Sequence, residues 1–182
     1  MAVDGDLAVR PLRDSEEDYA LLAGWFRDPR LLEWYHGRTD PFDLAKVKAR
    51  YGPRARGEDA TRSHVVERAG VPVGYVQCYP LEGSAETRSL VEDPRDGWGI
   101  DYFLGDPGLW GRGIGARMIA AFVRHLFEDR GAARVVSDPR VENVRSVRVL
   151  EKCGFRRVRV LPAHEKHEGE WRDCVLMEVL RP

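Results

Sequence analysis

The chain has 182 residues and a formal net charge of −1, and 43% of its residues are hydrophobic. This length fits one globular domain over residues 1–182 that buries about two-thirds of its unfolded surface without covalent staples. The three cysteines have no paired metal-ligand spacing, which argues against a disulfide framework or a zinc site and favours a cytoplasmic location. No apolar run suggests a targeting segment or a membrane span.

The first half of the chain predicts a strand, two helices and a hairpin. In chain order these are a strand over 7–13, helices over 16–27 and 42–50, and paired strands over 62–69 and 72–80. Asp14 or Ser15 supplies an N-cap for the first helix. Asp28–Pro29 ends that helix, and Asp40–Pro41 and Gly52–Pro53 bracket the second.

The second half predicts alternating strands and helices after a long polar loop. In order these are the loop over 82–96, a strand over 98–104, a helix over 114–130, a strand over 135–137, a short helix from Asn143 to near Gly154, and strands over 155–161 and 171–180. This order of elements favours a mixed α+β domain.

Charge is unevenly distributed along the chain. Residues 82–106 carry a net charge of −5, and residues 107–160 carry +7. Both segments can be solvated faces. The alternative is a basic half that holds an anionic cofactor beside an acidic mouth that attracts a cationic substrate. A nucleic-acid partner is not predicted, because the chain as a whole is not basic.

A glycine-rich run from Trp110 to Ala116 lies between a predicted strand and a predicted helix. Unpaired N–H groups at a helix N-terminus bind phosphate, so the run predicts an anion cradle. It also fits the dinucleotide fingerprint, with Asp138 at a suitable distance for a ribose. About a hundred mostly antiparallel-looking residues precede the run, which argues against a dinucleotide-binding fold. A third possibility is that the glycines serve only to make a tight turn between the strand and the helix.

The run and the order of elements resemble the GCN5-related N-acetyltransferase (GNAT) family. Gly113 and Gly115 match its pyrophosphate loop, whereas Trp110 stands at the usual Gln/Arg position. The resemblance implies a central, mostly antiparallel twisted sheet of about seven strands flanked by about four helices, with acetyl-CoA as cofactor. The cofactor-binding residues that it implies are Phe103, Leu104, Trp110, Gly111, Arg112, Gly113, Ile114, Gly115, Ala116, Asn143 and Ser146.

A narrower resemblance is to aminoglycoside 6′-N-acetyltransferases. It is carried by residues 32–35, 73–77, 99–104, 137–139 and 161–169. It implies acetylation of the 6′-amine of a cationic antibiotic by direct transfer in a ternary complex, which confers resistance. Asp101 is then the catalytic base, and the expected substrate-binding residues are Trp34, Tyr35, Gln77, Asp96, Asp138 and Glu142.

Several of these roles have plain alternatives. Trp34 and Tyr35 fit a core as well as a cleft, and Gln77 can face solvent or a substrate hydroxyl. Backbone N–H groups around Phe103 and Leu104 are expected to donate to the thioester oxygen. Leu150 occupies the position where many relatives have a tyrosine that protonates the leaving thiolate, which leaves water or Ser146 for that task.

The remaining candidate groups favour neither metal nor covalent chemistry. The histidines of 164–169 are expected in a solvated loop, and Cys78 and Cys153 lack a paired histidine. A monomer or homodimer is expected. The alternative activities within the same fold are acetylation of a protein N-terminus and acetylation of a siderophore N-hydroxylysine. The alternative that is not an enzyme is a non-catalytic module that binds coenzyme A.

Overall fold

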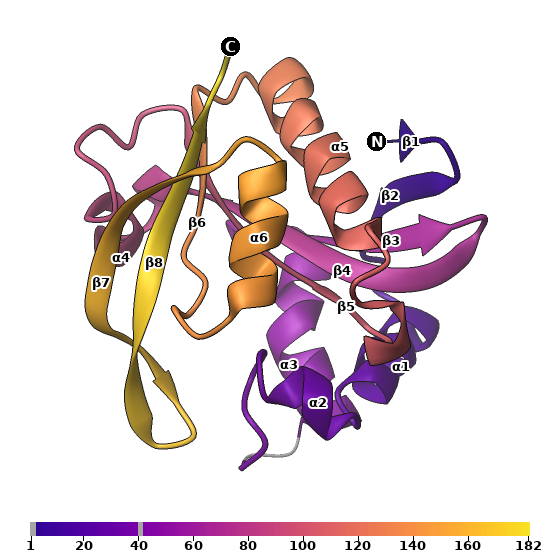
Figure 1. Ribbon diagram of the computed structural model, residues 1–182. Helices are drawn as coiled ribbons and strands as arrows, with labels where there is room; N and C mark the ends of the chain where they lie inside the picture. The colour runs from indigo at the N-terminus through magenta and orange to yellow at the C-terminus, as the bar shows by residue number, and fades with distance from the viewer. Residues whose placement is uncertain (1–2, 40–41) are drawn as a thin grey trace.

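The computed structural model describes residues 3–39 and 42–182, and one twisted sheet organises them (Figure 1). The strands follow the order β1-β2-β3-β4-β5-β6-β8-β7, and every neighbouring pair is antiparallel except β5 and β6. Their bounds are β1 Val3–Asp4, β2 Leu7–Pro11, β3 Arg62–Arg68, β4 Val71–Pro80, β5 Gly97–Leu104, β6 Arg134–Ser137, β7 Arg156–His167 and β8 Glu170–Leu180. The predicted α+β fold is confirmed: seven main strands plus the two-residue β1.

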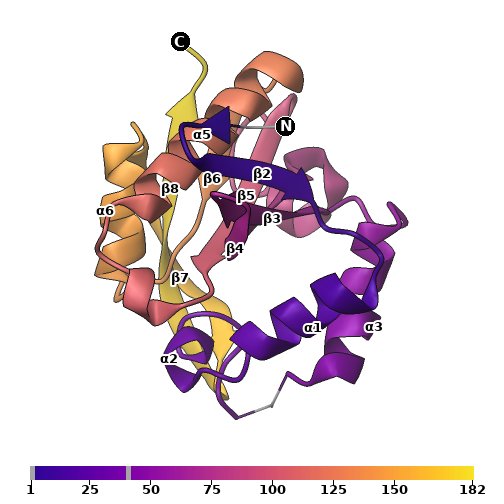
Figure 2. The same cartoon turned by 90° about the vertical axis from the view of Figure 1, so that its right-hand side faces the viewer.

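Helices cover both faces of the sheet (Figure 2). They are α1 Glu16–Trp25, α2 Pro29–Leu32, α3 Leu44–Ala55, α4 Ala85–Arg88, α5 Ile114–Asp129 and α6 Val144–Lys152, with 3-10 turns at Leu81–Gly83 and Pro107–Leu109. Because side chains alternate along a strand, Val76 and Ile100 pack with α5, whereas Tyr75 and Phe103 pack with α1 and α3. The four main helices are therefore held by opposite faces of the same strands.

Helix α3 and strand β7 both continue beyond their predicted ends. The prediction ended the second helix at Gly52–Pro53, but α3 includes Pro53 and ends at Ala55. Its last turn is held by fully buried Tyr51 and by a 3.0 Å hydrogen bond from Arg56 N to Gly52 O, so the loss of one proline donor is tolerated. The Asp40–Pro41 break lies outside the described residues.

Residues 164–167, predicted as loop, belong to β7. They pair with β8 around a tight turn in which Glu168 and Gly169 have φ values of 52° and 87°. Such a two-residue turn matches the twist of a hairpin, which is why the strand reaches His167. The helices α2 and α4 were not predicted, because a single turn carries no periodic signal.

The sheet opens between β5 and β6. Parallel pairing joins only Gly97–Gly99 to Arg134–Val136, while β5 continues to Leu104 without a β6 partner. The two strands therefore part at the middle of the sheet, and the functional site forms at this opening. None of the helices in the described part of the chain has the length and apolar character of a membrane span.

Candidate active site

The glycine run forms the N-terminus of α5, as predicted. Gly111 and Gly113 have φ values of 76° and 80°, a region that L-residues with a side chain rarely adopt. Gly113 is the N-cap of α5, and a Cβ at either position would meet nothing within 4 Å. Glycine is therefore required here by backbone conformation rather than by crowding, and the first N–H groups of α5 have no intrahelical acceptors.

A cavity of about 300 Å³, called here the narrow cavity, lies between this loop, the end of β5 and α6. Arg145, Arg148 and Lys152 of α6 line it, together with Gly111, Gly113, Gly115 and Ala116. A helix N-terminus facing three cationic side chains fits an anion such as the diphosphate of coenzyme A. Of the other loop residues, Arg112 is exposed, Ile114 is buried in the core, and neither lines the narrow cavity.

Trp110 carries an arginine on its ring. The Arg145 guanidinium lies 4.5 Å from the Trp110 ring centroid and 5.9 Å from that of Trp34. The Trp110 indole N–H also donates to the Leu104 carbonyl at 3.2 Å, which fixes the ring against β5. Although Trp110 has no charge of its own, it therefore holds a cation beside the glycine loop.

A second, wide cavity of about 730 Å³ lies on the β4 side of the same opening. Asp101 lies directly opposite Gln77 in the β4–β5 register, and the Gln77 amide donates to the Asp101 carboxylate at 2.6 Å. The Gln77 carbonyl in turn accepts from Arg54 at 2.7 Å and from the Tyr75 hydroxyl at 2.8 Å. Since Arg54 can only donate, this chain fixes which end of the Gln77 amide faces Asp101.

The charge of Asp101 is set by its surroundings. Burial and the neighbouring charge of Asp138 raise the pKa of Asp101 to about 6, against smaller opposing effects of the Gln77 hydrogen bond and the Arg54 charge. Asp138 also lies 2.9 Å from a ring nitrogen of His164 and raises the pKa of that histidine. Asp101 is thus a carboxylate poised near neutral pH, the range suited to a general base.

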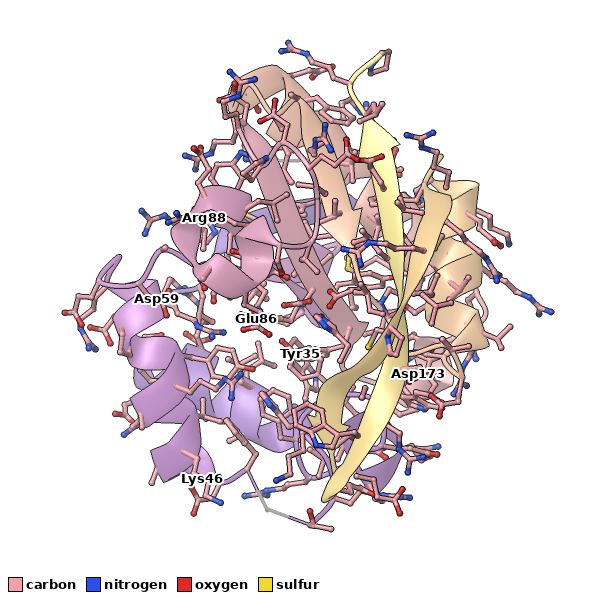
Figure 3. The ribbon with its side chains drawn as sticks, turned by 90° about the vertical axis from the view of Figure 1, so that its left-hand side faces the viewer. Tyr35, Lys46, Asp59, Glu86, Arg88 and Asp173 are labelled. Carbon is pink, nitrogen blue, oxygen red and sulfur yellow. The ribbon has the colours of Figure 1, made fainter. Side chains whose placement is uncertain are left out.

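Figure 3 looks at this face of the molecule, with Tyr35, Asp59 and Glu86 labelled; all three line the wide cavity. Both cavities are lined by Trp34 and Tyr35, and both rings are half-buried. Tyr35 packs against Phe103 with ring centroids 4.8 Å apart. Tyr35 therefore belongs at once to the edge of the core and to the cavity wall, whereas Trp34 has the Arg140 guanidinium 4.9 Å from its ring centroid.

Two predicted substrate-binding residues do not reach the wide cavity. Asp96 is exposed just before β5, and the four strand residues 97–100 separate it from Asp101 by roughly 16 Å. Glu142 is exposed beside Arg172, with charged atoms 3.9 Å apart. Neither residue lines the wide cavity, because an extended backbone quickly carries neighbours of Asp101 and Asp138 away from it.

The strand ladder separates the two predicted amide donors. Gly105 N donates to Val73 O at 3.0 Å, and hydrogen-bonded pairs alternate along an antiparallel ladder. By this alternation the Phe103 N–H faces β4, whereas the Leu104 N–H faces the opening toward β6. Leu104 is therefore the better placed donor for a thioester oxygen.

Three further residues of the site were missed from the sequence. Arg54 lies in the part of α3 beyond the predicted helix end, so its approach to Gln77 was hidden. Tyr75 and Tyr102 are ordinary strand aromatics in a sequence and become notable only through their hydroxyl contacts.

Comparisons with known proteins agree with this architecture. A family model described as an acetyltransferase (GNAT) domain matches residues 14–162. The aminoglycoside N(6′)-acetyltransferase type 1 of Klebsiella pneumoniae is 31% identical over 143 residues, 79% of this chain and 71% of that protein. The structure of AAC(6′)-Ib in complex with ribostamycin and coenzyme A has a TM-score of 0.83 at 26% identity, covering 97% of this chain and 94% of that one.

A more distant relative is the N5-hydroxyornithine acetylase sidL of Beauveria bassiana, 27% identical over 146 residues, 79% of this chain and 26% of that protein. The family model covers most of the chain, and the fold resembles that of an acetyltransferase with bound coenzyme A almost from end to end. The chain therefore belongs to the GNAT family and is an acetyl-CoA-dependent N-acetyltransferase.

Proposed function

We propose that the chain acetylates the 6′-amine of aminoglycosides by direct transfer from acetyl-CoA in a ternary complex, and so confers resistance. The observation that carries this proposal is the pairing of Asp101 with Asp138 in a wide cavity that joins the narrow cavity. Two carboxylates in one cavity suit a substrate with several ammonium groups. Further support comes from relatives whose names specify the 6′-position of aminoglycosides.

Each group of the site then has a task. Bound acetyl-CoA supplies the activated acetyl group. The N-terminus of α5 and Arg145 hold its diphosphate, and the Leu104 N–H donates to the carbonyl oxygen. Asp101 binds the substrate ammonium and accepts its proton, directly or through water, and Asp138 binds a second substrate cation.

A second candidate is an amine that also carries a carboxylate, such as the N-hydroxylysine of siderophores. The observation that favours it is the presence of two arginines, Arg50 and Arg54, in the wall of the wide cavity. Their positive charges repel a purely cationic substrate, whereas a carboxylate is bound by guanidinium groups. The fungal N5-hydroxyornithine acetylase among the relatives supports this alternative.

The test is thiol release from acetyl-CoA across matched acceptors. The panel contains aminoglycosides that differ only in a 6′-amine or a 6′-hydroxyl, N-hydroxylysine, and peptides with a free N-terminus. We expect turnover only with the 6′-amine. Replacement of the second carboxylate, Asp138→Asn, is expected to raise KM for that acceptor about tenfold or more, because hydrogen bonds to charged groups contribute about 1.5–3 kcal/mol.

Other results would replace the proposal. Equal turnover of the 6′-hydroxyl compound contradicts the 6′-assignment. Turnover confined to N-hydroxylysine supports the second candidate, and binding of coenzyme A without turnover of any acceptor supports a non-catalytic module.

A further inference from the structure

Two hydroxyl groups meet where the wide and narrow cavities join. The residues that line both cavities are Trp34, Tyr35, Tyr102, Asn143 and Ser146. Among them, the Tyr102 hydroxyl lies 2.8 Å from the Ser146 hydroxyl and 3.3 Å from the Ser146 carbonyl oxygen. Tyr102 thus spans the opening in the sheet from β5 to α6.

This junction is where the bond to sulfur must break. A donor held in the narrow cavity and an acceptor amine at Asp101 in the wide cavity can react only where the two spaces are continuous. Tyr102 directly follows Asp101 in β5, and successive strand side chains point to opposite faces. Asp101, which lines only the wide cavity, therefore points to one face, while Tyr102, which lines both cavities, points to the face covered by α6.

Helix α6 supplies no phenol for the leaving group. Leu150 is fully buried, and it lies on the same helix face as Ser146, one turn further along. Tyr102 brings a phenol to this face from the neighbouring strand. The phenol that α6 lacks is therefore supplied by β5, and Asn143 holds the contact point by accepting from Ser146 N at 3.1 Å.

We propose that Tyr102 donates a hydrogen bond to the sulfur of coenzyme A as the thiolate leaves, with Ser146 donating to the Tyr102 oxygen. The acceptor nitrogen forms the new C–N bond as the C–S bond breaks, and the sulfur keeps the electron pair of that bond. Asp101 first passes the proton of the substrate ammonium to water, then accepts the proton that the attacking amine loses, and Tyr102 keeps its own.

Acidity decides between a hydrogen bond and proton transfer. Burial raises the pKa of Tyr102 above the usual value of a phenol, and its contact with Ser146 offsets only part of this effect. A free thiol has a pKa of about 8.5. Transfer of the Tyr102 proton to the thiolate is therefore uphill, so Tyr102 stabilises the negative charge without giving up its proton.

The experiment is a titration of the thiol of bound coenzyme A, followed by thiolate absorbance, in the wild type and Tyr102→Phe. A hydrogen bond to a charged group corresponds to about one to two pKa units, so the pKa of the bound thiol should rise by that amount in Tyr102→Phe. The affinity for desulfo-coenzyme A, which has no sulfur to contact, should not change. With an accepted amine, kcat should fall about 10–100-fold, with little change in KM for acetyl-CoA.

Two further variants make the result specific. Ser146→Ala should raise the pKa of the bound thiol by less than Tyr102→Phe, because it removes only the orienting partner. An unchanged thiol pKa in Tyr102→Phe overturns the proposal. The control is Tyr35→Phe, which removes the other tyrosine hydroxyl at the junction. A thiol pKa that rises in Tyr35→Phe but not in Tyr102→Phe also overturns the proposal. The proposal rests on acetyl transfer at this junction, but the titration needs no acceptor, so its failure is distinct from a wrong acceptor assignment.

Discussion

At the scale of single residues, Asp101 shows what a sequence conveys about a proposed catalytic base. Its strand and its neighbouring glycine loop are evident from the pattern of residues. Its protonation is not evident, because its pKa depends on burial and on the opposing effects of Asp138, Gln77 and Arg54, which come from the end of β6, from β4 and from α3. The adjacency of Gln77 follows from strand pairing, whereas that of Arg54 depends on how α3 packs on the sheet.

The pKa of Asp101 predicts how activity depends on pH. A general base works only when deprotonated, so kcat/KM should fall as pH decreases through about 6, the pKa of Asp101. In Asp101→Asn, kcat/KM should fall by about 100-fold or more, and the decrease of kcat/KM at acidic pH should disappear. Initial rates from pH 5 to 9 measure both effects. Near-normal turnover in Asp101→Asn, with the decrease at acidic pH intact, would remove Asp101 from the base role.

At the scale of elements, prediction succeeded where local chemistry determines the structure. Helix α5 begins at Ile114 as expected, because an apolar stripe follows a glycine N-cap. The end of β7 and the last turn of α3 were predicted wrongly, since a partner strand and the burial of Tyr51 decide them. The opening between β5 and β6 also depends on pairing, and no residue pattern marks it.

The glycine cradle can be tested with a matched pair of variants. Gly113→Ala places a side chain at φ 80°, and Gly70→Ala does the same at φ 78° in the β3–β4 turn. Neither new Cβ would meet an atom within 4 Å, so each variant should lose about 1–2 kcal/mol of stability from backbone strain alone. Only Gly113→Ala should also weaken coenzyme A binding, about tenfold if one amide contact is lost. Calorimetric titration measures this affinity, and equal affinities in the two variants would place the diphosphate elsewhere.

At the scale of the whole molecule, the two cavities bring distant parts of the chain to one opening. The acidic segment 82–106 contributes Glu86 and Asp101 to the wide cavity, but Arg50 and Arg54 of α3 line it as well. The expected acidic mouth is therefore mixed in charge. The basic segment behaves more as expected, since its arginines and lysine on α6 line the narrow cavity. Linear charge counts predicted the charge of the narrow cavity better, because α6 is a single continuous element.

The same arrangement predicts that the acetyl group passes directly between the two substrates. Burial raises the pKa of Cys78 and of Cys174 to about 12, so neither thiol is a nucleophile near neutral pH. The half-buried Cys153 is engaged with the Ala116 carbonyl, and burial raises its pKa too. Initial-rate plots against both substrates should therefore intersect, and mass spectrometry after incubation with acetyl-CoA alone should show no acetylated protein. Parallel plots with an acetylated cysteine, lost in Cys153→Ser, would instead establish a covalent intermediate.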